Sequence, residues 1–430
     1  MALIKLPKFR INLKKLNLFP GLKKFRLSPA LKKLRLRPER KKYDPNHPLK
    51  VAFYTDTFLP NVDGVVNAML AYREELAKRG DEVYIFTSGT DKDASEYGNS
   101  KTFYFESLVF PPYPQYKVAI FPFSSINIAR KSGVQLIHSH AIASMGLAAI
   151  ASAKALNLPL VGTFHTMVPK AGFVLTKNAF GKKLFSDVTW GAIRQFYSPF
   201  DLVTAPTRTI EKLLNENGIT HTAVSPNGID LKKFNPSHDG NVIRTLLGIG
   251  KHEKIILTAG RLSDEKNVNI LIEAFSHLLK EKDAKLIIQG DGPSRPRLQK
   301  LAKKLNIDKS VIFTGFVKSY EVPYFYCAAD VFATASTFET QGLALLEAMA
   351  SGSICVGAKS LAIPELIQHN ENGYLFHPNN SNDLCEKMLT ALDLSKSSKN
   401  RIIKNAIATA GKYSKEKSTD ALLRAYEKVL

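Results

Sequence analysis

The chain has 430 residues, of which 44% are hydrophobic and 23% charged, the composition of an ordinary soluble globular protein of two or three domains. No run of about 18 uncharged apolar residues occurs, which argues against a membrane-spanning helix. Lys and Arg interrupt the N-terminus every few residues, which argues against a secretory signal. Three cysteines, an odd number without metal-ligand spacing, indicate a reducing compartment rather than a disulfide framework.

The net charge of +22 is concentrated at the N-terminus. Residues 1–50 hold 11 Lys and 5 Arg against one Asp and one Glu, a net charge of +14, which leaves +8 for the other 380 residues. The basic character therefore belongs mostly to an appendage, which we assign to residues 1–47, and only slightly to the folded body.

This basic arm contains an internal repeat. The unit Leu-Lys-Lys-(Leu/Phe)-x-Leu-x-Pro begins at Leu13, Leu22 and Leu31, and its proline limits any helix to a short piece. Cations beside apolar side chains suit an anionic membrane surface. A disordered, solvated tail and a nucleic-acid contact are the alternatives, although the arm lacks the Tyr or Trp platforms of single-strand binders.

From residue 48 onward, short apolar runs alternate with helical segments, for example at 65–78, 145–156, 268–280 and 295–305. This pattern predicts an α/β protein with parallel sheets covered on both faces. The predicted strands form two series, separated by the turn formers at 226–236: 50–55, 82–87, 136–139, 160–164, 202–205 and 222–225, then 254–259, 285–289, 311–314, 331–333 and 354–357. We therefore expect two Rossmann-like, doubly wound domains, at 48–228 and 229–412, facing a central cleft.

The most informative stretch is Phe338-Glu-Thr-Gln-Gly-Leu-Ala-Leu-Leu-Glu-Ala-Met-Ala-Ser-Gly352. Glu339 falls in a strand-to-helix loop, and Glu347 falls about two turns into the helix. The amides around Gly342 and Leu343 would point at an anion over the helix start. A diphosphate flanked by carboxylates for sugar hydroxyls fits this arrangement, while ordinary glutamates at a helix N-terminus are the structural alternative.

Two further candidate loops each follow the first predicted strand of one series. Gly260-Arg-Leu-Ser-Asp-Glu-Lys-Asn267 places Arg261 and Lys266 at the carboxyl edge of the second sheet, where they could stabilise a departing diphosphate. A solvated loop with an Asp264–Lys266 contact is the alternative. Phe58-Leu-Pro-Asn-Val-Asp-Gly-Val-Val66 places Gly64 at a helix start, where its backbone could approach a ligand.

Histidines and one acidic pair complete the candidates. His165, at the end of a buried strand, could hydrogen-bond a sugar hydroxyl, whereas we interpret His138 and His140 as structural. Asp91-Lys-Asp93 spells the D-x-D metal motif, but its polar surroundings indicate a solvated loop.

In these residues the chain resembles the retaining glycosyltransferases of family 4, which have the GT-B fold. The likeness runs from about Leu49 to the C-terminus and includes the turn Pro226-Asn-Gly-Ile-Asp230. It rests on four blocks in order: the Gly64 loop, Phe164-His165-Thr166, Gly260-Arg261 with Lys266, and Glu339 with Glu347 in an E-x7-E block ending Glu-Ala-Met-Ala-x-Gly. One position departs from the family pattern: Ser353 stands where the family often has proline. Because that position is structural, the difference does not argue against activity.

The resemblance implies a role for each matching residue. Glu347 would bind the ribose hydroxyls of the donor, and Glu339 the transferred sugar, with His165 near the reacting centre. The diphosphate would be held by Arg261, Lys266, the Gly64 backbone and the amides of Gly342 and Leu343. The backbone around Phe316 and Val317 would contact the nucleobase. A C-terminal helix near 413–430 is expected to pack back on the N-terminal domain.

The implied reaction is the transfer of a hexose from a nucleotide-sugar with retention of configuration, with no metal required because Arg261, Lys266 and a helix terminus supply positive potential. The first block looks most like members that glycosylate diacylglycerol. The predicted loop 167–183 supports a lipid acceptor, because its cations stand among apolar residues; they are Lys170, Lys177, Lys182 and Lys183. We expect a cytoplasmic protein held peripherally at the inner face of the membrane, with no nucleic-acid partner.

Three alternatives remain from the sequence. They are a glycosyltransferase acting on a soluble sugar or polysaccharide precursor, a nucleotide-sugar epimerase, and a non-catalytic protein that binds a sugar nucleotide.

Overall fold

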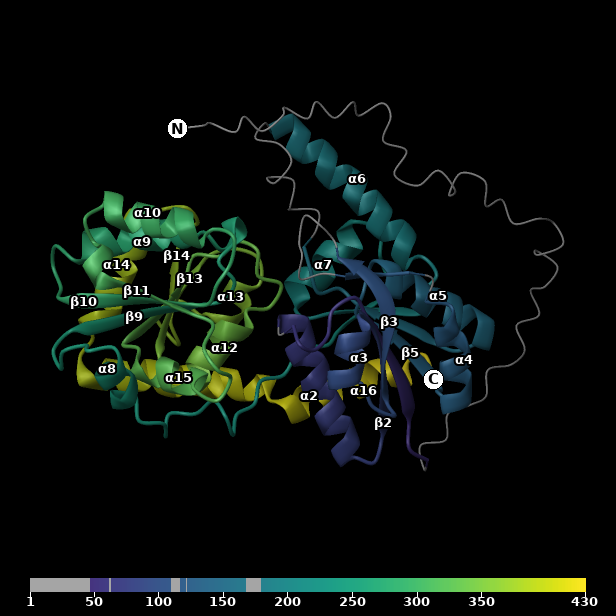
Figure 1. The fold of residues 1–430 in the computed structure, drawn as a ribbon. Coiled ribbons are helices and arrows are strands. Elements are labelled where there is room, and N and C mark those ends of the chain that lie inside the picture. The colour runs from purple at the N-terminus through teal and green to yellow at the C-terminus, as the bar shows by residue number, and fades with distance from the viewer. Residues whose placement is uncertain (1–46, 62, 110–116, 121, 168–178) are drawn as a thin grey trace. The chain divides into compact units, whose positions relative to one another are not determined.

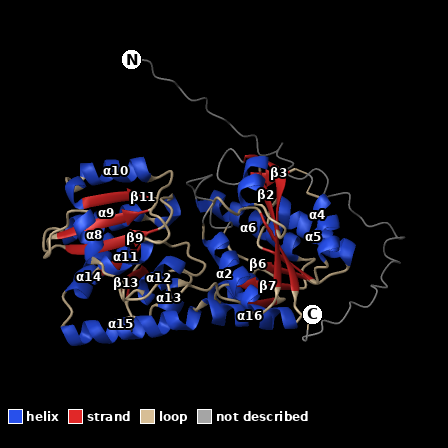
Figure 2. Cartoon of the chain, turned by 60° about the horizontal axis from the view of Figure 1, so that its bottom comes forward, coloured by secondary structure: helices blue, strands red, loops and turns tan. Residues whose placement is uncertain are grey.

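The computed structural model describes residues 47–61, 63–109, 117–120, 122–167 and 179–430. They form two separate sheets, one of eight strands and one of six. Helices cover both faces of each sheet (Figures 1 and 2). The basic arm and the residues 168–178 of the predicted acceptor loop lie outside the described residues.

The first sheet has the strand order β4-β3-β2-β1-β5-β6-β7-β8. All neighbours pair in parallel except β3 and β4, which are antiparallel. Its strands are β1 Lys50–Thr55, β2 Glu82–Gly89, β3 Thr102–Val109, β4 Lys117–Ala119, β5 Leu136–Ser139, β6 Leu160–Thr163, β7 Leu202–Ala205 and β8 Thr222–Val224. The helices between them are α2 Gly64–Lys78, α3 Asp91–Tyr97, α4 Ser124–Ser132, α5 Ser144–Leu156, α6 Ala179–Tyr197 and α7 Arg208–Glu216.

The second sheet is entirely parallel, in the order β11-β10-β9-β12-β13-β14. Its strands are β9 Lys254–Ala259, β10 Ala284–Gln289, β11 Val311–Gly315, β12 Val331–Thr334, β13 Ile354–Ala358 and β14 Tyr374–Phe376. Its helices are α8 Asn241–Leu246, α9 Val268–Leu278, α10 Arg295–Lys304, α11 Val322–Ala328, α12 Leu343–Ala350, α13 Ile363–Leu366, α14 Ser381–Leu392 and α15 Lys396–Ala410.

The central strands are short apolar runs, as burial on both faces of a parallel sheet requires. Every residue of β5, β6, β7 and β13 is buried. The bounds of β1, β5, β7 and β9 agree with those predicted from the sequence. The predicted fold, two Rossmann-like domains of the α/β class, is confirmed.

The last helix, α16 Lys415–Glu427, packs against the first sheet rather than the second. Leu422, Ala425 and Tyr426 belong to the same buried cluster as residues of β1 and α2. Arg79, at the end of α2, also donates to the Asp420 carboxylate at 2.7 Å. The end of the chain thus completes a core formed mainly by its first described residues.

Each sheet reverses its strand order at one point, between β1 and β5 in the first and between β9 and β12 in the second. In open α/β sheets, ligands bind outside the carboxyl ends of the strands at such a switch point. The loops after β1, β9 and β12 carry Gly64, Arg261 with Lys266, and Glu339. His165 follows β6, the next strand beyond the first switch point. The topology therefore gathers the predicted residues at the edges where ligands bind.

Candidate active site

Lys266 and Glu339 form the charged centre of the candidate site. Lys266 ends a 3-10 turn, Asp264–Lys266, and its ammonium group donates to Glu339 Oε1 at 2.7 Å. Burial by itself lowers the pKa of Lys266, but the Glu339 carboxylate raises it above the ordinary value overall. Burial likewise raises the pKa of Glu339, but Lys266 and a bond from Ser336 lower it overall. Both groups are therefore charged near neutral pH.

The solvated contact between Asp264 and Lys266 considered above is not what the structure shows. Asp264 accepts instead from Ser294 at 2.7 Å and from Arg297 at 2.9 Å. Lys266 instead points to the Glu339 carboxylate, on the loop after β12. Because Glu339 is partly buried, this ion pair is stronger than one at the protein surface.

Glu347 occupies a different environment. It lies on α12, and its Oε2 accepts from the hydroxyl of Tyr326 on α11 at 2.9 Å. Burial raises its pKa to about 7, while Tyr326 and the charge of Lys233 oppose this rise. Two carboxylates on one segment are thus held in different states, Glu339 ionised and Glu347 half-protonated near pH 7.

The start of α12 lies beside the loop after β1. Gly342, immediately before the helix, has φ +97°, a conformation that favours glycine. A methyl group on Gly64 would lie 3.7 Å from Leu343 Cδ1. Next to Gly64, Asp63 accepts from the amides of Val65 and Val66 at 2.9 Å each.

The charge of Arg261 also acts on this aspartate. It lowers the pKa of Asp63, against the larger effect of burial, which raises it. The loop after β1, the loop after β9 and the start of α12 therefore meet in one place.

Thr340 connects the Glu339 loop to His165. The Thr340 hydroxyl donates to the His165 carbonyl at 3.0 Å, and the Thr340 carbonyl accepts from the Thr207 hydroxyl at 3.0 Å. The next residue, Gln341, exchanges two 2.8 Å bonds with the backbone of Asn227. The sequence indicated Thr340 to Leu343 only for their backbone amides, so the side-chain contacts of Thr340 and Gln341 were not predicted.

The side chain of His165 forms a hydrogen bond with a second histidine. His140, immediately after β5, has its Nδ1 at 2.9 Å from His165 Nε2. Burial lowers the pKa of His165 to about 4 and that of His140 well below its ordinary value. His138 is structural, as predicted: Tyr426 Oη and Thr163 Oγ1 each lie 2.7 Å from its ring nitrogens. His140, by contrast, reaches the site.

Phe316, Val317 and Lys183 are the remaining predicted site residues that the structure describes. Phe316, after β11, is 86% exposed, and Val317 packs partly against the core of the second domain. Lys183 is exposed on α6. Lys170 and Lys177 lie outside the described residues, as does the side chain of Lys182.

The Asp91-Lys-Asp93 segment is not the solvated loop that its composition indicated. It begins α3, where Asp93 is buried, forms a capping box with Thr90 and pairs with Lys117. The prediction was wrong because polar residues such as Asp, Ser and Lys are common both in solvated loops and in the first turn of a helix. Among the described residues, no group of three or more His, Cys, Asp or Glu is placed to hold a metal ion.

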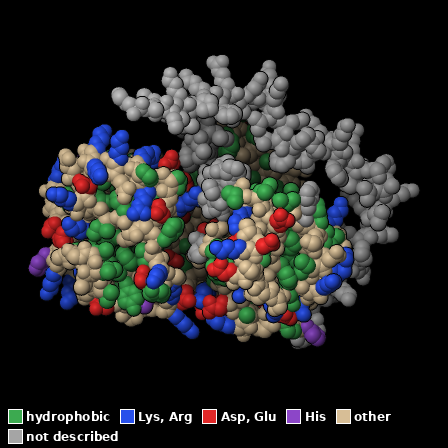
Figure 3. Space-filling model, in the orientation of Figure 1, with side chains coloured by type: hydrophobic (Ala, Val, Ile, Leu, Met, Phe, Trp, Pro, Cys, Tyr) green, Lys and Arg blue, Asp and Glu red, His purple; other side chains and the backbone are tan. Residues whose placement is uncertain are grey.

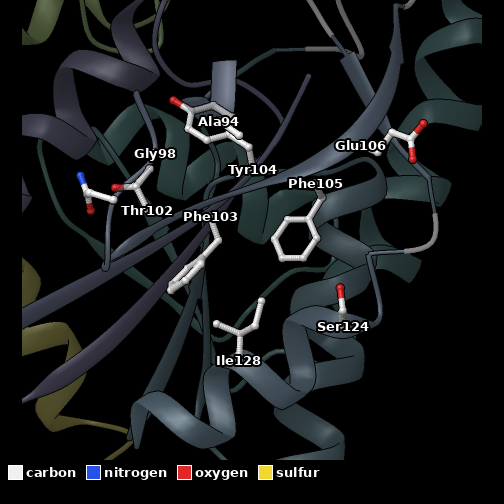
Figure 4. A pocket seen from close by; sticks show the side chains of 10 residues that line it. Ala94, Gly98, Thr102, Phe103, Tyr104, Phe105, Glu106, Ser124 and Ile128 are labelled. Carbon is white, nitrogen blue, oxygen red and sulfur yellow. The ribbon is translucent and has the colours of Figure 1, made fainter. Parts of the chain in front are cut away.

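A pocket of about 500 Å³ opens elsewhere in the first domain, beside β3 (Figure 4). Phe103, Phe105 and Ile128 form its apolar wall, and Ser124 and Glu106 also line it. None of the predicted site residues within the described part of the chain lines this pocket. Its position by the sheet edge separates it from the chemistry described above.

Solved structures share this architecture. Sucrose-phosphate synthase from Thermosynechococcus elongatus superposes with a TM-score of 0.74 at 19% identity, covering 89% of this chain and 99% of that one. Anabaena HepE, solved in complex with UDP-glucose, gives 0.72 at 21% identity, covering 88% and 99%. The fold is GT-B.

Sequence comparisons identify the family to which this GT-B protein belongs. Residues 62–233 match the model of Glycosyltransferase Family 4, and residues 241–409 that of Glycosyl transferases group 1. An alpha-monoglucosyldiacylglycerol synthase of Streptococcus pneumoniae is 33% identical over 351 residues, 80% of this chain and 78% of that protein. One from Acholeplasma laidlawii is 29% identical over 383 residues, 86% and 94% respectively. The chain belongs to glycosyltransferase family 4, as its motifs indicated.

Proposed function

We propose that this glycosyltransferase moves a hexose from a nucleotide-sugar to the hydroxyl of a membrane lipid, with retention of configuration and without a metal. The observation that carries the proposal is the meeting of Arg261, Lys266 and Glu339 with the Gly64 loop and the start of α12. In the proposal, the diphosphate lies over that helix start, where backbone amides and the helix dipole favour an anion.

Two cations support metal-independent departure of the nucleoside diphosphate. Arg261 and Lys266 follow β9 at the switch point, so positive charge stands where the leaving group becomes more negative. Fixed charges of this kind are worth more in a partly buried site than in water. The 2.7 Å pair with Glu339 orients the Lys266 ammonium group before the donor binds.

The same pair supports retention by a front-face route. A carboxylate neutralised by an ammonium group at 2.7 Å is a weak nucleophile, so we assign Glu339 to hydroxyls of the transferred sugar. A phosphate oxygen of the departing group would then accept the proton of the acceptor hydroxyl as the new glycosidic bond forms on the same face. His165 would contact the sugar, and Glu347 the ribose.

A lipid acceptor is supported by two relatives and by one helix. The Streptococcus and Acholeplasma proteins are named as synthases of a glucosylated diacylglycerol. On α6, Leu184 is 51% and Val188 60% exposed, one helical turn apart, beside exposed Lys183. Apolar side chains next to a cation suit the surface of an anionic bilayer.

This peripheral mode of binding is consistent with the fold. No helix in the described part of the chain is both long and apolar enough to cross a bilayer. Hydrophobic side chains also appear among the charged ones on the face that Figure 3 presents.

The testing experiment is a panel of UDP-, GDP- and ADP-sugars in EDTA, with and without anionic vesicles that carry diacylglycerol. We expect turnover of one donor, increased by the lipid and unaffected by EDTA, with an α-linked product by NMR. The Glu347→Ala variant is the matched negative control. Transfer only to soluble sugars would replace the lipid acceptor, and loss of turnover in EDTA would overturn metal independence.

A further inference from the structure

His140, which the sequence indicated as a structural histidine, contacts the candidate catalytic residue His165. It directly follows β5 at the first switch point, and its side chain is 6% exposed. Its ring packs edge-on against Phe53, with centroids 4.8 Å apart, and beside His138 at 4.0 Å. One nitrogen, Nδ1, reaches His165 Nε2, at 2.9 Å.

A hydrogen bond between two neutral imidazoles contains one hydrogen, so its direction determines the tautomer of both rings. If His140 donates from Nδ1, its Nε2 is a bare acceptor and His165 carries its own hydrogen on Nδ1. If His165 donates from Nε2, His140 carries an N–H on Nε2 and Nδ1 of His165 is an acceptor. Burial keeps both rings neutral near pH 7, because it lowers the pKa of each.

The environment of the other His140 nitrogen favours one of these directions. Nε2 of His140 is buried and has no hydrogen-bond partner among the described residues. Orphaned N–H groups are rarer in protein interiors than under-used acceptors. A donating His140 leaves a lone pair at this buried position, whereas an accepting His140 leaves an N–H there.

We infer that His140 is a positioning residue for His165: it donates its Nδ1 hydrogen to Nε2 of His165, so that His165 presents an Nδ1–H donor to the donor sugar. Within the described part of the chain, His165 Nδ1 forms no hydrogen bond, while the backbone carbonyl of His165 accepts from the Thr340 hydroxyl. The ring is thus fixed at one nitrogen, and the other is directed to a hydroxyl or phosphate oxygen. Partners that orient a functional histidine through its second nitrogen commonly change activity by about 10–100-fold when removed, as known from metal sites.

The direct test is long-range ¹H–¹⁵N NMR of the full-length protein labelled at histidine, which reports which nitrogen of each ring carries hydrogen. We expect His165 to carry hydrogen on Nδ1 and His140 also on Nδ1. A hydrogen on Nε2 of His165 would overturn the inference. This readout requires no substrate, so its result is independent of the proposed function on which the kinetic test rests.

The kinetic test compares His140→Leu with His140→Asn. The Asn amide nitrogen stands close to the place of Nδ1 and can donate, while Leu cannot. We expect kcat to fall at least about tenfold in the Leu variant with KM for the donor within about twofold, and to recover most of this loss in the Asn variant. Equal kcat in the Leu variant and the wild type would overturn the inference, as would equal losses in both variants.

A matched control separates positioning from stability. His138→Gln disturbs the same buried strand, but His138 bonds to Tyr426 and Thr163 rather than to His165. We expect it to lower Tm while His165 keeps the Nδ1–H tautomer by NMR. If His138→Gln changes the His165 tautomer as His140→Leu does, the effect belongs to the strand as a whole and the inference fails.

Discussion

The ammonium nitrogen of Lys266 and the carboxylate of Glu339 lie 2.7 Å apart, although 73 positions separate them in the chain. Both residues stand on loops that follow adjacent strands, β9 and β12, at the switch point of the second sheet. Because the pair is partly buried, with side chains 30% and 19% exposed, each charge depends on the other for its stability. This coupling can be measured.

Lys266→Met should destabilise the protein more than the double variant Lys266→Met, Glu339→Gln, because the single change leaves an unpaired carboxylate. Loss of one partner of a buried polar contact costs about 1–3 kcal/mol. A double-mutant cycle by urea unfolding measures the difference. A coupling energy near zero would show that the pair is screened by water, in which case Lys266 is not oriented before the donor binds.

Glu347 should make donor affinity depend on pH. Its pKa in the folded protein is raised from 4.5 to about 7, so the ionised carboxylate that we propose as the acceptor for the ribose hydroxyls is lost as pH falls through 7. If Glu347 binds the ribose as proposed, affinity for the nucleotide-sugar should fall up to tenfold per pH unit below about 7, as measured by calorimetry between pH 5.5 and 8.5. Tyr326→Phe should move this midpoint upward, because Tyr326 lowers the pKa of Glu347.

The same group gives a stability change of predictable sign. Ionised Glu347 is disfavoured in the fold, so its contribution to the free energy of unfolding decreases as pH rises from about 4.5 to about 7. Glu347→Gln lacks this decrease and should gain stability relative to the wild type at pH 8. A pH-independent difference between the two proteins would contradict the raised pKa.

Arg261→Ala should reduce turnover at least about tenfold, because the change removes a positive charge that we propose stabilises the negative charge growing on the leaving diphosphate in the transition state. Arg297→Ala is the matched control: this residue is in the same domain but 60% exposed and paired with Asp264. We expect the control to stay within about twofold of the wild type. Similar effects of both changes would mean that general charge, rather than Arg261, stabilises the leaving group.

Asp93→Ala should lower stability without affecting any metal requirement. The change removes the Asp93 side chain from the capping box, whose N-cap is Thr90, and it removes the partner of Lys117; loss of one partner of a buried polar contact costs about 1–3 kcal/mol. Thermal unfolding and turnover in EDTA measure the two effects. A variant that is fully stable but loses turnover would return Asp91-Lys-Asp93 to the role of a metal site.

Deletion of residues 1–45 should weaken binding to anionic vesicles while Tm remains unchanged, because the removed segment carries most of the net charge. Vesicle sedimentation at two salt concentrations measures the binding. Leu184→Ser with Val188→Ser in the truncated protein tests α6 separately, because these two exposed apolar side chains lie on that helix. Full vesicle binding after the deletion would discard a membrane role for the arm.

The parts of the fold predicted from the sequence are those with continuous apolar strands. Strands β1, β5, β7 and β9 were predicted to the residue, because burial on both faces leaves an uninterrupted signal. The three strands missed are β3, β4 and β14. β4 and β14 have only three residues each, and β3 exposes Leu108 at 65% while pairing antiparallel with β4 at the sheet edge.

The candidate site was predictable where a motif names its residues, and not where function depends on contacts between distant segments. Glu339, Lys266 and His165 stand in recognisable blocks. His140 looked like any core histidine, because its contact with His165 crosses from β5 to β6. Tyr326 lies 21 positions from Glu347 and carries no motif. Their partners become visible only when the strands and helices are placed in space.

The position of α16 has a consequence for synthesis of the chain. Leu422, Ala425 and Tyr426 complete the core around β1 and α2, so the domain made first can finish folding only after the last residues have left the ribosome. Between the end of β8 and the start of α16, translation at about 5–20 residues per second takes about 10–40 s. Throughout this interval the apolar residues of β1 and α2 that α16 covers lack that cover, and exposed apolar surface on a nascent domain favours aggregation.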